Sequence, residues 1–167
     1  MSGKITPCLW FDGQAEEAAR FYISVFGDGS VDSVEYYPDP MPFPAPFPAG
    51  AVMLVEFTLF GQAFQALNGG PEFRFTEAIS LSVACRDQAQ LDGWFDALTA
   101  DGGSPAPCGW VKDKYGLSWQ LVPDAVAAMQ RSGDRAGIAR MMAAMMAGPM
   151  QKLDIAVLRA AFDGEGA

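Results

Sequence analysis

Apolar positions along the chain alternate between the spacing of strands and the spacing of helices. Residues 5–11 read as a short strand, and residues 15–26 place apolar side chains on one face of a helix. The same order returns at residues 79–85, followed by a second helical face. That face consists of Leu91, Trp94, Phe95 and Leu98. The pattern therefore predicts a strand–helix unit that occurs twice.

Capping residues define the ends of these two helices. Gly27 follows the first helix, where a left-handed residue favours glycine. Asp87 and Gln90 have the spacing of a capping box before the second helix. Gly102 and Gly103 are expected to end that helix.

Each predicted unit continues into a similar pair of strands. Residues 60–65 and 115–120 share one order: aromatic, Gly, two residues, aromatic, Gln. The glycines suit hairpin turns. Between residues 52 and 60, Met53, Val55, Phe57 and Leu59 lie on one side of the predicted strand. Glu56 and Thr58 lie on the other, with Val52 and Leu54.

A proline-rich segment lengthens the first unit. Residues 37–48 hold six prolines at every second position, a sequence that cannot form a ladder strand. We expect an extended loop that displays Phe43 and Phe47. Either these rings form a lid over a cavity mouth or they cover core.

The pattern becomes helical from Asp124 to the end of the chain. Gly148–Pro149 is expected to break this region, and a last helix is expected to end at Asp163–Gly164. The predicted apolar stripe of the first part is Ile138, Met141, Met142, Met145 and Met146; that of the last helix is Leu153, Ala156, Val157, Ala160 and Ala161. The methionine stripe is interpreted as core or as a dimer contact.

Charge and composition narrow the classes of function. The chain has 20 acidic against 11 basic residues and no histidine. Without histidine there is no histidine base, triad or metal ligand. The acidic excess lies in residues 1–123, which argues against nucleic acid and anionic membranes as partners. A neutral or cationic small molecule remains possible.

The cysteines and the apolar segments indicate the expected cellular setting. Cys8, Cys85 and Cys108 are isolated from one another, as reduced thiols of a cytoplasmic protein would be, and are interpreted as small core residues. Met1 to Lys4 shows no secretory signal, and the longest apolar stretches are interrupted by charge, so no membrane span is expected.

The duplicated pattern resembles the βαβββ module pair of the vicinal oxygen chelate superfamily, which includes glyoxalases and bleomycin-resistance proteins. Within it, residues 5–11, 15–18, 21–22, 115–121 and 150–158 resemble the PhnB-like branch, often labelled a demethylubiquinone methyltransferase. The resemblance implies an α+β fold of two modules whose curved mixed sheets surround a cavity. Residues 1–70 would form the first module, with the loop at 38–48. Residues 71–123 would form the second, and 124–167 a helical extension of one compact domain.

The resemblance also implies where a metal would lie. Metal-dependent relatives place ligands at the openings of the two first strands and on the last strand of each module. The corresponding positions are Pro7 and Ala78, and Gln65 and Gln120. Proline and alanine have no ligating side-chain atom, and two neutral amides hold a divalent ion poorly. We therefore expect no metal and no other cofactor.

A ligand cavity is instead expected to be lined by aromatic and amide groups. An amide next to an aromatic ring can orient a planar polar ligand. The candidate ligand-binding residues are Trp10, Glu56, Phe64, Gln65, Trp119 and Gln120. The alternative for the two glutamines is a hydrogen bond to the backbone at the sheet edge, with no ligand involved, and for Glu56 it is ordinary exposure to solvent.

Other catalytic chemistry finds little support in the sequence. Ser80 and Ser82 have no nearby histidine or lysine as a base, and no glycine-rich phosphate or adenosylmethionine loop occurs. The sequence therefore predicts a metal-independent small-molecule binding protein that forms a homodimer and has no assigned catalytic residue. The alternative is an enzyme of the same branch that uses acid–base chemistry without metal, with Glu56 or Asp113 as a base.

Overall fold

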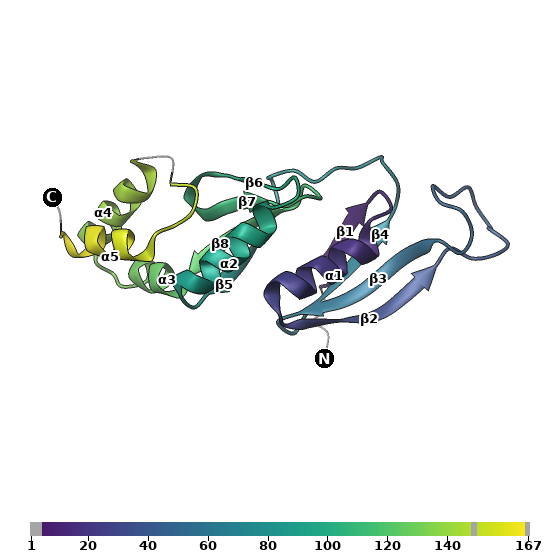
Figure 1. Cartoon of the computed structure of the whole chain (residues 1–167), viewed down its shortest axis with the longest axis horizontal. Coiled ribbons are helices and arrows are strands. Elements are labelled where there is room, and N and C mark those ends of the chain that lie inside the picture. The colour runs from purple at the N-terminus through teal and green to yellow at the C-terminus, as the bar shows by residue number, and fades with distance from the viewer. Residues whose placement is uncertain (1–4, 148–149, 166–167) are drawn as a thin grey trace. The chain divides into compact units, whose positions relative to one another are not determined.

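A computed structural model describes residues 5–147 and 150–165 of the chain (Figure 1). The chain divides into two compact units, Met1–Phe75 and Thr76–Ala167. Each unit contains one mixed sheet of four strands. In the described ranges, no helix is long and apolar enough to cross a membrane.

The first unit has the element order β-α-β-β-β. These elements are β1 (Cys8–Phe11), α1 (Ala15–Phe26), β2 (Gly29–Tyr36), β3 (Val52–Leu59) and β4 (Gln62–Asn68). The strand order in the sheet is β1-β4-β3-β2, with β1 parallel to β4 and the other pairs antiparallel. The first and last strands of the module are therefore neighbours.

The second unit repeats this order. Its module consists of β5 (Ser80–Cys85), α2 (Gln88–Thr99), β6 (Ser104–Pro105), a 3-10 turn η1 (Pro107–Gly109), β7 (Trp110–Lys112) and β8 (Ser118–Pro123). The sheet order is β5-β8-β7-β6, and β5 is parallel to β8. The predicted α+β fold of two βαβββ modules is thus confirmed.

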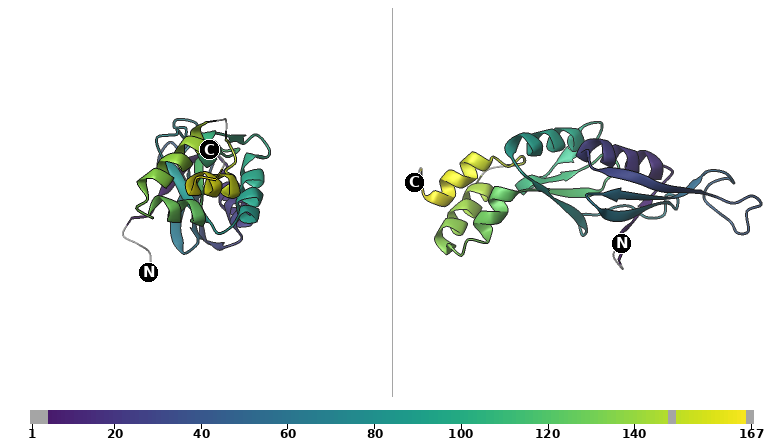
Figure 2. Two further views of the ribbon diagram at one scale, coloured as in Figure 1. Left: turned by 90° about the vertical axis from the view of Figure 1, so that its left-hand side faces the viewer. Right: turned by 90° about the horizontal axis from the view of Figure 1, so that it is seen from below.

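Three helices follow the second module within the same unit. They are α3 (Asp124–Gln130), α4 (Arg135–Met146) and α5 (Ile155–Asp163). Figure 2 shows them packed together at the end of the chain. The predicted break at Gly148–Pro149 lies outside the described residues. The last helix ends as predicted, because Gly164 adopts a left-handed conformation after Asp163.

Helix α1 supplies the core of the first unit. Its bounds and its left-handed cap at Gly27 are those that the sequence predicts. Tyr22 is fully buried and lies 6.4 Å, centroid to centroid, from Phe57 of β3. The predicted alternation of β3 is also confirmed, since Val55, Phe57 and Leu59 are buried. Burial of such side chains contributes about 1.5–3 kcal/mol each.

Helix α2 buries the face that the sequence predicts, Leu91, Trp94, Phe95 and Leu98. Asp87 accepts a hydrogen bond from Gln90 N (2.8 Å). Gln90 Oε1 in turn accepts a hydrogen bond from Arg86 N (2.9 Å). In a capping box the donor would be the N–H of the next residue, Asp87. The helix ends at Thr99, before the predicted glycines.

The apolar faces of the last two helices differ from the predicted stripes. Of the predicted methionine stripe only Met141 is buried, whereas Met142 and Met146 are 52% and 71% exposed. On α5 the buried residue is Leu158, which the predicted stripe omits, and Val157 is 48% exposed. Helical spacing identifies an apolar face, but which part of it is covered depends on tertiary packing.

Two loops of the first unit adopt the conformations that their residues favour. Phe60 and Gly61 connect β3 to β4 with positive φ at both residues, as in the turns that suit the twist of hairpins. The proline-rich segment forms a loop between β2 and β3 (Figure 1). Phe47 packs against buried Tyr37 at 6.2 Å, while Phe43 is 50% exposed. Phe47 therefore covers core.

Asn68, at the end of β4, joins three segments of the first unit. Its Oδ1 accepts from Ala15 N at the start of α1 (2.9 Å), and its Nδ2 donates to Val52 O of β3 (3.0 Å). Its own carbonyl oxygen accepts from the Tyr37 hydroxyl (2.5 Å). Gln14, which caps α1, makes no side-chain capping bond, so Asn68 caps that helix from a distant strand.

We predict that Asn68→Ala lowers the free energy of unfolding by about 2–4 kcal/mol, because it leaves the Ala15 N–H and the Val52 carbonyl without their side-chain partner. Urea denaturation measures this change. Gln62→Ala, at an exposed position of the same strand, should change the free energy of unfolding by less than about 0.5 kcal/mol. An N68A protein as stable as the unmodified chain would contradict the prediction.

Candidate functional site

The first unit presents one sheet face that α1 does not cover (Figure 2). Side chains that alternate with the buried Val55, Phe57, Phe64 and Ala66 lie on this face. The strand register aligns four of them in a row across the sheet: Cys8 pairs with Gln65, Gln65 with Glu56, and Glu56 with Ser33. We call this row the polar row.

Two hydrogen bonds position the carboxylate at the middle of the polar row. Glu56 Oε2 accepts from Ser33 Oγ (3.1 Å), and Oε1 accepts from Gln65 Nε2 (3.2 Å). A carboxylate has about four lone-pair sites, so Glu56 keeps acceptor capacity beyond these two bonds. The Gln65 carbonyl oxygen can accept as well. The row therefore presents an oriented anionic acceptor with a neutral amide next to it.

A hollow of about 360 Å³ adjoins the polar row toward the β3–β4 turn. Glu56, Thr58 and Ala63 line it from the sheet, and Asp32 and Thr6 contribute from its edges. Its size is at the lower end for a small-molecule site. Most of its functional groups are oxygen acceptors or hydroxyls.

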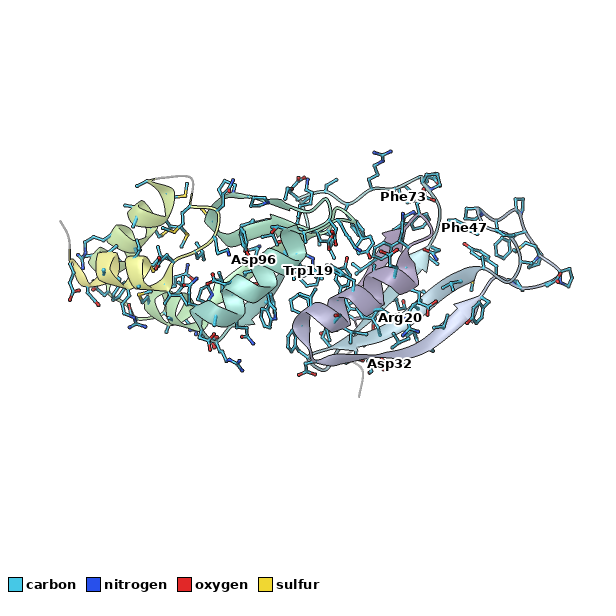
Figure 3. All side chains as sticks on the ribbon, in the orientation of Figure 1. Arg20, Asp32, Phe47, Phe73, Asp96 and Trp119 are labelled. Carbon is cyan, nitrogen blue, oxygen red and sulfur yellow. The ribbon has the colours of Figure 1, made fainter. Side chains whose placement is uncertain are left out.

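Asp32 of β2 (Figure 3) lines this hollow, and the register of β2 is irregular between Val31 and Ser33. A bulge of this kind re-aims a side chain. Asp32 Oδ2 accepts from Thr58 Oγ1 and Oδ1 from Ser30 Oγ, both at 2.7 Å. Both bonds lower the pKa of the Asp32 carboxyl, the one from Thr58 more than the one from Ser30. Asp32 is therefore a second fixed carboxylate.

The other candidate residues of the first unit lie apart from the hollow or on its back wall. Trp10 is half-buried on β1, where its Nε1 donates to Gly70 O (2.8 Å) and its ring meets Phe73 edge-on at 4.9 Å. A Cβ at Gly69 would come within 2.2 Å of the Trp10 ring, so glycine is required there. Phe64 is buried and stacks on Phe57 at 5.3 Å. Phe64 and Gln65 thus point to opposite faces of β4.

The second unit contains Gln120 in a neutral setting. Gln120 pairs with Ser82 of β5 and Trp110 of β7, and its Nε2 donates to Ser80 Oγ (2.8 Å). No carboxylate is paired with it in the sheet register. This bond joins two side chains of the sheet, whereas the alternative expected for the glutamines is a bond to the backbone.

Trp119 belongs to the core of the second unit (Figure 3). It is 3% exposed, and its Nε1 donates to Asp113 Oδ2 (2.9 Å). Asp113 Oδ1 accepts from Tyr115 N and Leu117 N at 2.9 and 3.0 Å. The buried Asp113 carboxylate thus organises the β7–β8 turn, and its position is that of a structural group.

Strand register shows which first-strand residues lie opposite the two glutamines. Pro7 and Ala78 precede β1 and β5, whereas the residues in register with Gln65 and Gln120 are Cys8 and Ser82. Cys8 is exposed, which corrects its interpretation as a core residue; Cys85 is buried. In the described ranges, no three His, Cys, Asp or Glu side chains converge as a metal site would require.

Sequence reasoning missed Asp32, Thr58 and Ser33 as members of the site. Period-two alternation placed Glu56 and Thr58 on one face, which was a usable signal. The bulge at Asp32 leaves no comparable signal, because the run from Gly29 to Tyr36 contains polar residues at both phases of the alternation.

These features define the class of proteins with a glyoxalase-like fold: paired βαβββ modules, each with a parallel contact between its first and last strands and with glutamines at equivalent positions. Within that class, residues 3–122 match the family described as 3-demethylubiquinone-9 3-methyltransferase. The chain belongs to this family. No functionally curated protein matches it.

Solved structures show the same fold. A putative 3-demethylubiquinone-9 3-methyltransferase, a PhnB protein from Bacillus cereus, is 36% identical with a TM-score of 0.63; the match covers 72% of this chain and 99% of that one. The protein PA1353 from Pseudomonas aeruginosa is 24% identical, with a TM-score of 0.58 and coverage of 74% and 100%. The fosfomycin resistance protein FosX from Listeria monocytogenes shares the fold at 13% identity, with a TM-score of 0.51 and coverage of 73% and 90%.

We predict that Thr58→Val raises the pKa of the Asp32 carboxyl toward its ordinary value, because it removes the hydrogen bond from the Thr58 hydroxyl, which lowers this pKa the most. NMR titration of the Asp32 side-chain carbon measures this. Since the folded pKa is the lower one, the stabilisation is present above the unfolded pKa and is lost as the pH falls through the folded pKa.

Thr58→Ser is the matched control, since it retains the hydroxyl and should keep the pKa of Asp32 low. The stability difference between T58V and T58S should accordingly be larger at pH 6 than at pH 2. An unchanged pKa of Asp32 in T58V would show that Thr58 does not hold the carboxylate.

Proposed function

We propose that this chain is a metal-independent binding protein for a neutral or cationic small molecule, held at the polar row and the adjoining hollow. The observation that carries the proposal is the Glu56 carboxylate, fixed by Ser33 and Gln65 on the uncovered sheet face. Preorganised acceptors bind a donor group without the cost of ordering side chains on binding.

The charge and composition of the hollow favour a ligand that donates hydrogen bonds. Asp32 and Glu56 both line it, and among the residues that the structure describes no lysine or arginine does. An anionic ligand would meet two carboxylates there, whereas an ammonium, guanidinium or amide group would find oxygen acceptors. The net negative charge of the chain likewise favours a neutral or cationic ligand over an anionic one.

Methyl transfer, named in the description of the family and of the Bacillus cereus relative, receives less support from the site. The β1–α1 turn, Asp12–Gln14, contains one glycine, and the Ala15 N–H at the start of α1 is already bonded to Asn68. That helix start therefore lacks the glycine-rich cradle common for nucleotide-like cofactors. We propose binding rather than catalysis, and a cytoplasmic location in keeping with three free cysteines.

Thermal unfolding with panels of primary amines, guanidines and neutral amides tests the proposal. A panel member present at 100 times its dissociation constant should stabilise the chain by about 2.7 kcal/mol, or roughly 5–10 °C. Glu56→Gln should remove the stabilisation by the cationic compounds of the panel. Gln65→Ala should reduce the stabilisation by every compound that binds. Recovery of the compound unchanged distinguishes a binder from an enzyme.

Glu72→Gln provides the matched control, because Glu72 is an exposed carboxylate of the same unit outside the polar row and the hollow. It should leave the stabilisation intact. Stabilisation by adenosylmethionine instead of the amines and amides, or loss of the effect in E72Q but not in E56Q, would overturn the proposal.

We also infer that the chain forms a homodimer. An open hollow between α4 and α5 is lined mainly by Ala143, Val157, Ala160 and Ala161, and apolar surface of this kind supports self-association. Light scattering should give twice the chain mass of 17.8 kDa. A mass equal to one chain at micromolar concentration would contradict the inference.

A further inference from the structure

A cysteine of η1 and a methionine of α4 bring two sulfur atoms together, outside the proposed ligand site. Cys108 Sγ lies 3.4 Å from Met146 Sδ, with the thiol donating to the thioether. The two residues are 38 positions apart, on η1 and at the end of α4. Their contact therefore results from tertiary structure rather than from chain proximity.

Backbone hydrogen bonds hold the main chain of the turn that carries this thiol. Cys108 N donates to Met150 O (2.9 Å), and Gly109 N donates to Gln151 O (3.1 Å). The 3-10 turn is thereby attached to the segment that follows α4. A further methionine, Met150, is thus anchored by its main chain next to Cys108. The cysteine side of the pair is rigid.

The methionine side of the pair is adaptable and accessible. Met146 is 71% exposed and Cys108 is half-buried, so a small ion can reach both sulfurs. Sulfur–metal bonds are about 2.3 Å long, so two sulfurs on one ion can be up to about 4.6 Å apart. The observed 3.4 Å is within that reach, and the flexible methionine side chain can widen it.

We propose that Cys108 and Met146 form a binding site for a soft monovalent metal ion, Cu(I) or its analogue Ag(I). Thiolate and thioether ligands select Cu(I), whereas divalent zinc requires about four nitrogen, sulfur or oxygen ligands. On binding, the ion displaces the thiol proton, which passes to solvent, and no electron is transferred.

The other two cysteines offer poorer sites. Burial raises the pKa of Cys85 to about 12, with Asp124 and Asp87 adding to the shift, so its thiolate is disfavoured and inaccessible. Cys8 is exposed on the polar row, and desolvation of its thiol raises its pKa as well. Its neighbour in register, Gln65, offers an amide rather than a second sulfur.

Titration of the reduced full-length chain with Cu(I), in competition with a chromogenic Cu(I) chelator under anaerobic conditions, tests the site. We expect one Cu(I) per chain, with no corresponding retention of Zn(II). Met146→Leu should weaken Cu(I) binding at least tenfold, because it removes the thioether and keeps the apolar volume. Cys108→Ser should abolish binding.

Two controls separate this site from the others. Met142→Leu, one turn earlier on α4 and also exposed, and Cys8→Ser should bind Cu(I) like the unmodified chain. Because Cys108 has a φ of 62°, Cys108→Gly is a second thiol-free variant that suits this backbone. Circular dichroism confirms that each variant folds.

Three results would overturn the proposal: Cu(I) retained by both C108S and C108G, unchanged binding in M146L, or loss of binding in C8S. None of them bears on the ligand at the polar row, which is measured separately with Glu56 and Gln65 variants. The two proposals can therefore fail independently.

Discussion

The hydrogen bonds of Asn68 set the geometry on which the first unit depends. One side chain caps α1, binds the start of β3 and lies on the strand that pairs with β1, so it fixes the helix relative to both sheet segments. With the helix held on one face, the alternation of β3 and β4 leaves Glu56 and Gln65 on the other. The position of the candidate site is thus a consequence of where the helix is anchored.

The two modules share a backbone pattern and differ in the chemistry of their uncovered faces. Gln65 and Gln120 occupy equivalent positions, but the first is bonded to a carboxylate and the second to a serine hydroxyl. Equivalent glutamines of the duplicated fold therefore have an anionic partner in the first unit and a neutral partner in the second. This asymmetry is the reason for assigning the proposed ligand site to the first unit.

Much of the fold could be predicted from sequence because its signals are local. The bounds of α1, the buried face of α2 and the turn at Phe60–Gly61 follow from periodicity and backbone preference. The side chains that cap and fix the site are long-range: Asn68 bonds to Ala15, and Ser33 to Glu56. The exposure of Met146 was likewise unpredictable, because helical spacing does not reveal which neighbour covers a face.

The adjacency of β1 and β4, and of β5 and β8, has a consequence for how such a chain can arise. Each module starts and finishes at neighbouring strands, so a second copy can be joined by a short connection without rethreading the first. Duplication of the coding segment would then yield two complete modules at once. Afterwards either copy can accumulate substitutions on its uncovered face while the other keeps its original chemistry.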